Sequence, residues 1–153
     1  MEAIPIIAGV GLTAALVWLA VVDLRTMRLP NALTLPLIAI GVAYSAWFTG
    51  ALQASVIGAA LGYGVFFTIE QAYRRLRGQH GLGRGDAKLA AAGGAWCGWM
   101  GLPFIVMMAS LSAILAVLIL RDRLVGEGGR VPFGPFLAMG IAAVYWAQLV
   151  VSG

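Results

Sequence analysis

Long uncharged stretches alternate with short charged ones along the chain, and this alternation predicts membrane-spanning helices. Such a helix needs about 20 mostly apolar residues. The longest uncharged stretch, residues 89–120, has 32 residues. It would form a helix of roughly 48 Å, too long for one crossing of a bilayer core about 30 Å thick. We therefore expect a break at Gly101 and Pro103. The pattern then predicts six transmembrane helices, at residues 4–22, 32–48, 52–69, 87–100, 103–120 and 135–151.

The basic residues agree with this count of helices. All ten Lys and Arg residues lie between the first and second, third and fourth, or fifth and sixth predicted helices, or at their edges. The opposite loops and the C-terminal segment have none. By the positive-inside rule, the basic side is cytoplasmic and both termini are outside. The sequence thus predicts an all-α, polytopic membrane protein with six transmembrane helices and N-out/C-out topology.

Composition supports a membrane protein. Only 10% of the 153 residues are charged, whereas a soluble domain has about 25%. We expect residues 1–153 to form a single transmembrane domain, with no separate soluble one. Glu2 stands where a signal peptide would be basic, so the first helix is expected to remain in the membrane. Cys97 is the only cysteine, which excludes an internal disulfide and a cysteine-based zinc site. The net charge of +4 follows from the topology and indicates no nucleic-acid partner.

Two acidic residues, Asp23 and Asp86, lie at the ends of apolar segments, both on the predicted cytoplasmic side. An acid at the edge of a bilayer core is costly, so it indicates function. Asp23 ends the first helix, where the helix dipole disfavours an ionised carboxylate, and Asp86 begins the fourth, where the dipole favours one. One acid can then stay protonated while the other is ionised. Such a pair can activate a water and protonate a substrate carbonyl.

Glycines stand before Asp86 and on the third predicted helix. Gly81, Gly83 and Gly85 alternate in GLGRGD, so the backbone there can pass close to another chain and leave room for an extended peptide. Gly58 and Gly62 in the third helix have the four-residue spacing that lets membrane helices approach closely.

Simpler interpretations of the two acids remain open from the residues alone. Asp86 can serve as the N-cap of the fourth helix. Asp23 can pair with Arg25 or Arg28 at the interface. Two membrane acids can also form a proton or cation pathway in a protein that is not an enzyme. A transporter would more plausibly have acids near mid-membrane, whereas both of these lie at one end.

Three motifs resemble the type IV prepilin peptidase (leader peptidase) family of membrane-embedded aspartic proteases. Asp23 followed by Leu29-Pro30-Asn31 resembles the first, GLGRGDAKL the second, and VPFGPFLAMG a segment found late in many members. Their order and spacing agree with the family over nearly the whole chain. The resemblance implies that Asp23 and Asp86 form the catalytic dyad. It also implies supporting roles for an active-site loop (Gly83, Gly85, Lys88), a turn (Pro30, Asn31) and a segment lining the substrate approach (Pro132, Phe133, Gly134, Pro135).

The implied activity is an intramembrane aspartic endopeptidase in the cytoplasmic (inner) membrane of a prokaryote. It would remove short basic leaders from prepilin or pseudopilin substrates at the cytoplasmic interface, without a metal or other cofactor. The alternative within this class is a related Gly-x-Gly-Asp protease with other substrates, such as preflagellins. Larger members carry an insertion with paired cysteines, associated with zinc and N-methylation. This chain has one cysteine, so it resembles a peptidase-only form. Three arginines are expected to contact anionic lipid headgroups: Arg74, Arg75 and Arg77. No role is expected for His80.

Overall fold

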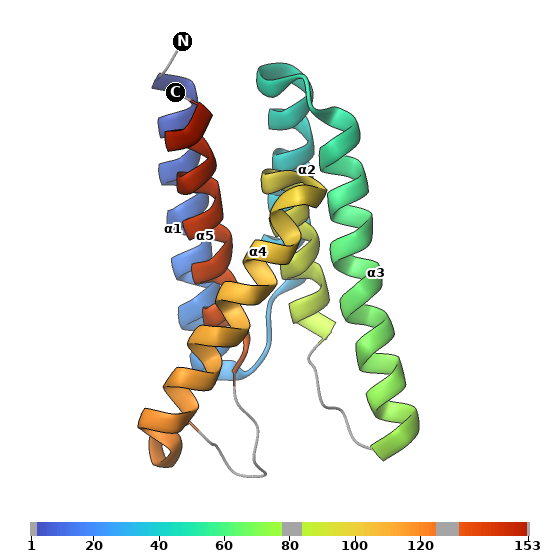
Figure 1. Ribbon diagram of the computed structural model, residues 1–153, viewed down its shortest axis with the longest axis vertical. Helices are drawn as coiled ribbons and strands as arrows, with labels where there is room; N and C mark the ends of the chain where they lie inside the picture. The colour runs from blue at the N-terminus through green and yellow to red at the C-terminus, as the bar shows by residue number, and fades with distance from the viewer. Residues whose placement is uncertain (1–2, 78–83, 125–131, 153) are drawn as a thin grey trace.

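The computed structural model describes residues 3–77, 84–124 and 132–152, and the regular structure within these ranges is helical (Figure 1). In chain order the elements are α1 (Ala3–Thr26), α2 (Asn31–Tyr44), the π-helix η1 (Ser45–Thr49), α3 (Leu52–Arg77), α4 (Arg84–Leu124) and α5 (Gly134–Ser152). The all-α fold expected from the sequence is therefore confirmed.

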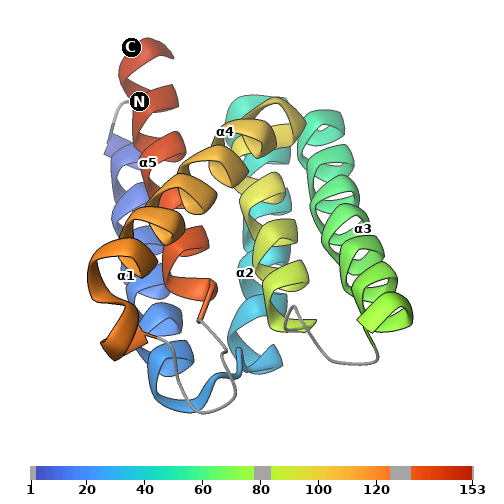
Figure 2. The ribbon, with the colours of Figure 1, turned by 60° about the horizontal axis from the view of Figure 1, so that its bottom comes forward.

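Within the described ranges, five helices are long and apolar enough to cross a membrane: α1, α2 with η1, α3, α4 and α5. This is one fewer than predicted, because residues 84–124 form one helix where the sequence suggested two. However, α4 is not straight. Figures 1 and 2 both show its second half running back toward the end of the molecule at which its first half began.

The change of direction in α4 is centred on Gly98, so the break expected at Gly101 and Pro103 was misplaced. Gly98 has a φ of +70°, a left-handed conformation that glycine adopts without steric cost. Pro103 lies inside the helix near the start of the returning half, where few intrahelical hydrogen bonds are lost. Gly101 permits close packing instead, since a Cβ there would lie 2.7 Å from the Cys97 Cβ and 3.4 Å from Val144 of α5.

Side chains from three other elements bind backbone carbonyls at this turn. The hydroxyls of Ser45 and Ser55 donate to the Ala95 carbonyl, at 3.3 and 2.6 Å. The Gln148 amide of α5 donates to the Cys97 carbonyl at 3.0 Å. A carbonyl released from a helix inside a membrane must find a partner within the protein. These polar side chains in otherwise apolar helices therefore stabilise the turn.

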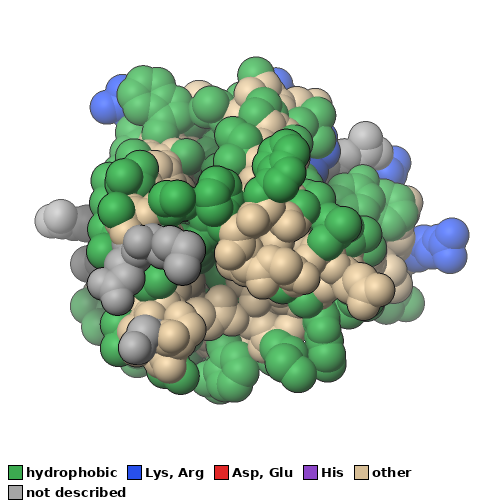
Figure 3. Space-filling model, turned by 90° about the horizontal axis from the view of Figure 1, so that it is seen from above, with side chains coloured by type: hydrophobic (Ala, Val, Ile, Leu, Met, Phe, Trp, Pro, Cys, Tyr) green, Lys and Arg blue, Asp and Glu red, His purple; other side chains and the backbone are tan. Residues whose placement is uncertain are grey.

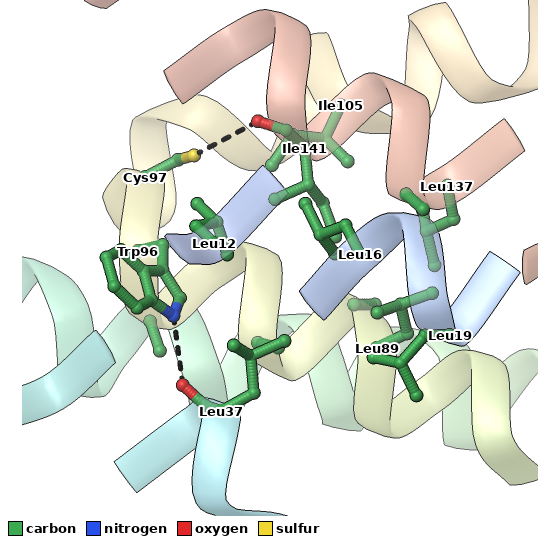
Figure 4. Packing of buried hydrophobic residues seen from close by; sticks show 14 of the residues in the cluster. Leu12, Leu16, Leu19, Leu37, Leu89, Trp96, Cys97, Ile105, Leu137 and Ile141 are labelled. Atoms are coloured by element: carbon green, nitrogen blue, oxygen red, sulfur yellow. Dashed lines mark hydrogen bonds between the residues drawn. The ribbon is translucent and has the colours of Figure 1, made fainter. Parts of the chain in front are cut away.

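The core lies where α1, α4 and α5 meet (Figure 4). Leucines at helical spacing on α1 (Leu12, Leu16, Leu19) pack against buried residues of α4 and α5 (Leu89, Ile105, Leu137, Ile141). Trp96 of α4 reaches α2, where its indole N–H donates to the Leu37 carbonyl at 2.9 Å. The core thus packs α1 against α5, and both α5 and α2 against α4.

Helices α3 and α4 pack with almost no space between their backbones. A Cβ at Gly58 would collide with the Gly94 carbonyl, and one at Gly62 would collide with the Ala90 carbonyl. The close approach predicted from glycine spacing is therefore present. It also sets an antiparallel register between α3 and the first half of α4.

The two ends of the helical bundle differ. α1 begins and α5 ends at one end (Figure 1). Viewed from that end, the surface carries hydrophobic and uncharged side chains, with Lys and Arg visible only around the rim (Figure 3). The last turn of α1 and the first turns of α4 and α5 lie toward the opposite end (Figures 1 and 2). That end therefore holds both candidate acids.

Candidate active site

Asp23 lies in the last turn of α1 and points into the protein. Only 6% of its surface is exposed, whereas Arg25 and Arg28 are exposed. Its carboxylate oxygen Oδ2 accepts a hydrogen bond from the backbone N–H of Gly134 at 3.1 Å. Asp23 therefore binds the first residue of α5, and the expected alternative of pairing with a nearby arginine is not what the structure shows.

This contact changes the electrostatic environment of the Asp23 carboxylate. The sequence placed the acid at the negative end of the α1 dipole, which alone disfavours an ionised carboxylate. The hydrogen bond from Gly134 adds the positive, N-terminal end of α5 next to the same carboxylate. The neighbouring helix supplies the favourable field that α1 lacks. The contrast expected between the two acids is therefore smaller than reasoning from each acid's own helix suggested.

Asp86 lies in the first turn of α4 and is also buried, with 7% of its surface exposed. The helix begins at Arg84, so Asp86 is inside its first turn, whereas an N-cap residue would precede it. Asp86 also takes part in a polar or electrostatic interaction. The two acids thus share a setting: each carboxyl group is buried next to the N-terminal end of a helix, α5 for Asp23 and α4 for Asp86.

The segment between α1 and α2 connects the two acids structurally. The Leu29 side chain packs on Gly85, where a Cβ would lie 2.6 Å from the leucine Cβ. The Lys88 ammonium donates a hydrogen bond to the Asn31 side-chain carbonyl. This segment follows directly from the last turn of α1, which holds Asp23, and it contacts the first turn of α4, which holds Asp86. These contacts bring Gly85, Lys88 and Asn31 together beside the first turn of α4.

The backbone just after Asp23 has an uncommon conformation. Met27 has a φ of +52°, which is rare for a residue other than glycine and tends to be retained at functional sites. Its N–H donates to the Asp23 carbonyl at 2.8 Å and so closes the last turn of α1. The chain then turns sharply into the contact with Gly85.

The Pro-Phe-Gly-Pro segment lies directly against the candidate site. Phe133 is half-buried and its ring centroid is 6.4 Å from that of Phe66 on α3. A Cβ at Gly134 would collide with the Asp23 carboxylate. The family resemblance implied that this segment lines the substrate approach. The structure adds a specific contact: Gly134 leaves room for Asp23 and binds it.

An open hollow of about 760 Å³ lies beside the α1–α2 turn. Its walls come from the end of α1 and the start of α2: Val22, Thr26, Arg28, Leu29, Pro30 and Asn31. Because Val22 immediately precedes Asp23, the hollow adjoins the candidate site. Within the described residues, no three His, Cys, Asp or Glu side chains are close enough together to hold a metal ion.

Some expected site residues lie outside the described ranges, and one described acid was not anticipated. Gly83, Gly81 and His80 fall in the segment that the structure does not describe. Glu70, near the end of α3, is 3% exposed and so is more deeply buried than either aspartate. The sequence contains a signal for it, because Glu70 continues the four-residue spacing of Gly58 and Gly62.

These features describe a helical membrane protein with buried carboxyl groups, Asp23 and Asp86 among them, at one end of its bundle. The chain belongs to the type IV leader peptidase family, whose model matches residues 10–118. It is 45% identical to a prepilin leader peptidase/N-methyltransferase of Burkholderia pseudomallei (strain 1026b) over 140 residues, which are 90% of this chain and 45% of the relative.

Proteins with the same name from other bacteria are also similar. The protein from Escherichia coli (strain K12) is 42% identical over 127 residues, covering 80% of this chain and 55% of the relative. That of Aeromonas salmonicida (strain A449) is 39% identical over 149 residues, covering 94% and 50%. The chain thus spans about half the length of the curated relatives it matches. No solved structure matches it significantly.

Proposed function

We propose that residues 1–153 act as one intramembrane aspartic endopeptidase domain in which Asp23 and Asp86 are the catalytic dyad. The supporting observation is that both carboxyls are buried at the same end of the bundle, Asp23 against the N-terminus of α5 and Asp86 in the first turn of α4. In the proposed mechanism, the ionised carboxylate removes a proton from water as the water attacks the scissile carbonyl. The protonated carboxyl donates its proton to the carbonyl oxygen, and later transfers give the leaving amine its proton.

The geometry also supports a topology for this site. In the proposal, α4 crosses the membrane twice, turning at Gly98, so the chain makes six crossings with both termini outside. The ends of α1 and the beginnings of α2, α4 and α5 then face the cytoplasm, where Arg25, Arg28 and Lys88 satisfy the positive-inside rule. Arg74 and Arg75 are exposed on α3 and would meet anionic lipid headgroups.

Cysteine labelling in intact cells tests this topology. In a Cys97→Ala background, Arg28→Cys and Leu124→Cys should be protected from an impermeant maleimide, and Ala51→Cys should react. Arg28 and Leu124 serve as independent reporters, because they flank different helices on the same predicted side. Labelling of Leu124→Cys from outside would mean that α4 crosses once, and the six-crossing proposal would be wrong.

The proposed substrates are prepilins or pseudopilins, supported by the family match and by the names of the curated relatives. A substrate of this kind has a cytoplasmic leader followed by an apolar helix, so its scissile bond reaches the membrane at the depth of the two acids. The hollow beside the α1–α2 turn is open at this end and would admit an extended peptide.

A cleavage assay with exchanged leaders tests the substrate class. The purified protein in liposomes should cut a model prepilin at a single bond, and mass spectrometry should locate this bond at the leader boundary. A matched substrate with a preflagellin leader on the same apolar helix should be cut at least about tenfold more slowly. Faster cleavage of the preflagellin leader would favour the alternative protease class. No cleavage of either substrate would contradict the proposed function.

A further inference from the structure

Helix α3 contacts the rest of the protein through one narrow row of residues. Five of its residues are buried, spaced three or four apart: Ser55, Gly58, Gly62, Phe66 and Glu70. The first four pack against neighbouring helices or bind them. The last is an acid, at a position where an apolar residue would continue the packing at lower cost.

The register of this row against α4 locates Glu70. Ser55 binds the Ala95 carbonyl, and further along the row Gly62 packs against Ala90. Because the two helices are antiparallel, another step of four residues along each brings Phe66 to the level of Asp86. The contact of Phe66 with Phe133, next to the Gly134 that binds Asp23, independently places this level at the site.

Glu70 therefore lies about one helical turn, ~5.4 Å, beyond the level of Asp86. The residues around it on α3 are accessible: Ile69 is 51% exposed and Tyr73 is 41% exposed, while Glu70 is 3% exposed. The Glu70 side chain is therefore buried by residues packed against the row, and its neighbours on α3 do not bury it. Glu70, like Asp86, takes part in a polar or electrostatic interaction.

The start of α4 is a favourable environment for a second carboxylate. The first four N–H groups of a helix have no intrahelical acceptor, and this end of the helix carries a partial positive charge. A buried carboxylate next to it gains charge-assisted hydrogen bonds that offset its desolvation. In this register the start of α4 lies between the levels of Phe66 and Glu70.

We propose that Glu70 is a positioning residue of the active site, whose buried carboxylate holds the first turn of α4, and with it Asp86, against α3. The consequence for catalysis rests on the proposed function of Asp86. The proposed contact between Glu70 and the first turn of α4 does not depend on that function, because it concerns only where the end of the helix lies.

Two substitutions separate the role of the charge from that of the shape. Glu70→Gln keeps the shape and removes the anionic acceptor, so kcat for leader cleavage should fall about tenfold with KM within about twofold. Glu70→Asp keeps the charge and should retain more activity than Glu70→Gln. Thr68→Val is the control, because Thr68 is exposed and binds only within α3, at Gly64. If Glu70→Gln is normal and Glu70→Asp is impaired, shape matters and the proposal is wrong.

A labelling experiment tests the hold without using activity. Ala87 follows Asp86 and is 1% exposed, so Ala87→Cys in a Cys97→Ala background should be protected from a water-soluble maleimide. Adding Glu70→Gln should increase its labelling rate at least about tenfold, whereas Thr68→Val should not change it. If Ala87→Cys is equally protected with and without Glu70→Gln, the proposal is wrong, even if Asp23→Asn and Asp86→Asn abolish cleavage. Conversely, increased labelling would support the hold even if those aspartates proved dispensable.

Discussion

Replacing Asp23 or Asp86 by Asn should lower leader cleavage by at least about 100-fold and leave insertion and folding nearly intact. Removal of a general acid or base typically costs this much or more in rate. An amide is nearly the same size as a carboxylate and carries no charge to desolvate, so the helices should tolerate it. Cleavage of a model prepilin and thermal melting of the purified variants measure the two effects.

Arg25→Gln is the matched control, because it removes a charge two residues from Asp23 on an exposed side chain. It should retain near-normal cleavage. The unsubstituted protein should also lose activity at both acidic and alkaline pH, since the reaction needs one ionised and one protonated carboxyl, and the two limits belong to the pair. If either Asn variant cleaves at a near-normal rate, the dyad assignment is wrong and the proton-pathway interpretation becomes the better one.

The helices and the two acids could be predicted because their signals are local. A charge-free stretch must stay in lipid whatever its neighbours are, and the one-sided arginines predict an orientation without reference to packing. The turn in α4 was harder, because residues 98, 101 and 103 all offer a break. Which one takes a left-handed φ depends on tertiary contacts: Ser45, Ser55 and Gln148 bind the carbonyls nearest Gly98.

The environment of the acids could not be predicted in the same way. The contact between Asp23 and Gly134 joins residues 111 positions apart, and no periodic pattern encodes it. Considering each acid with its own helix alone led to an electrostatic contrast that the α5 N-terminus reduces. Glu70 was missed for a different reason. Hydropathy ends the third predicted helix at Ile69, so an acid at the next position appears to be outside the membrane core.

Gly134→Ala should reduce leader cleavage by roughly 100-fold, although the substitution adds only one methyl group. The new Cβ would occupy the space of the Asp23 carboxylate, so the carboxylate, the start of α5, or both must move. A shift of about 1 Å at a catalytic group can cost about two orders of magnitude in rate. The effect should be mainly on kcat, because the hollow proposed to admit the substrate is lined by other residues. Steady-state kinetics on the folded fraction measures it.

Gly140→Ala on the same helix separates this local effect from general damage to α5. A Cβ there would lie 2.7 Å from the Ile105 carbonyl, so it disturbs the packing of α5 on α4 as strongly, but away from Asp23. Both variants should lose about 1–3 kcal/mol of stability, as overpacked sites typically do. Only Gly134→Ala should also lose activity per folded molecule. If the two variants lose activity equally, α5 acts as ordinary support, and the hydrogen bond from Gly134 does not set the position of Asp23 for catalysis.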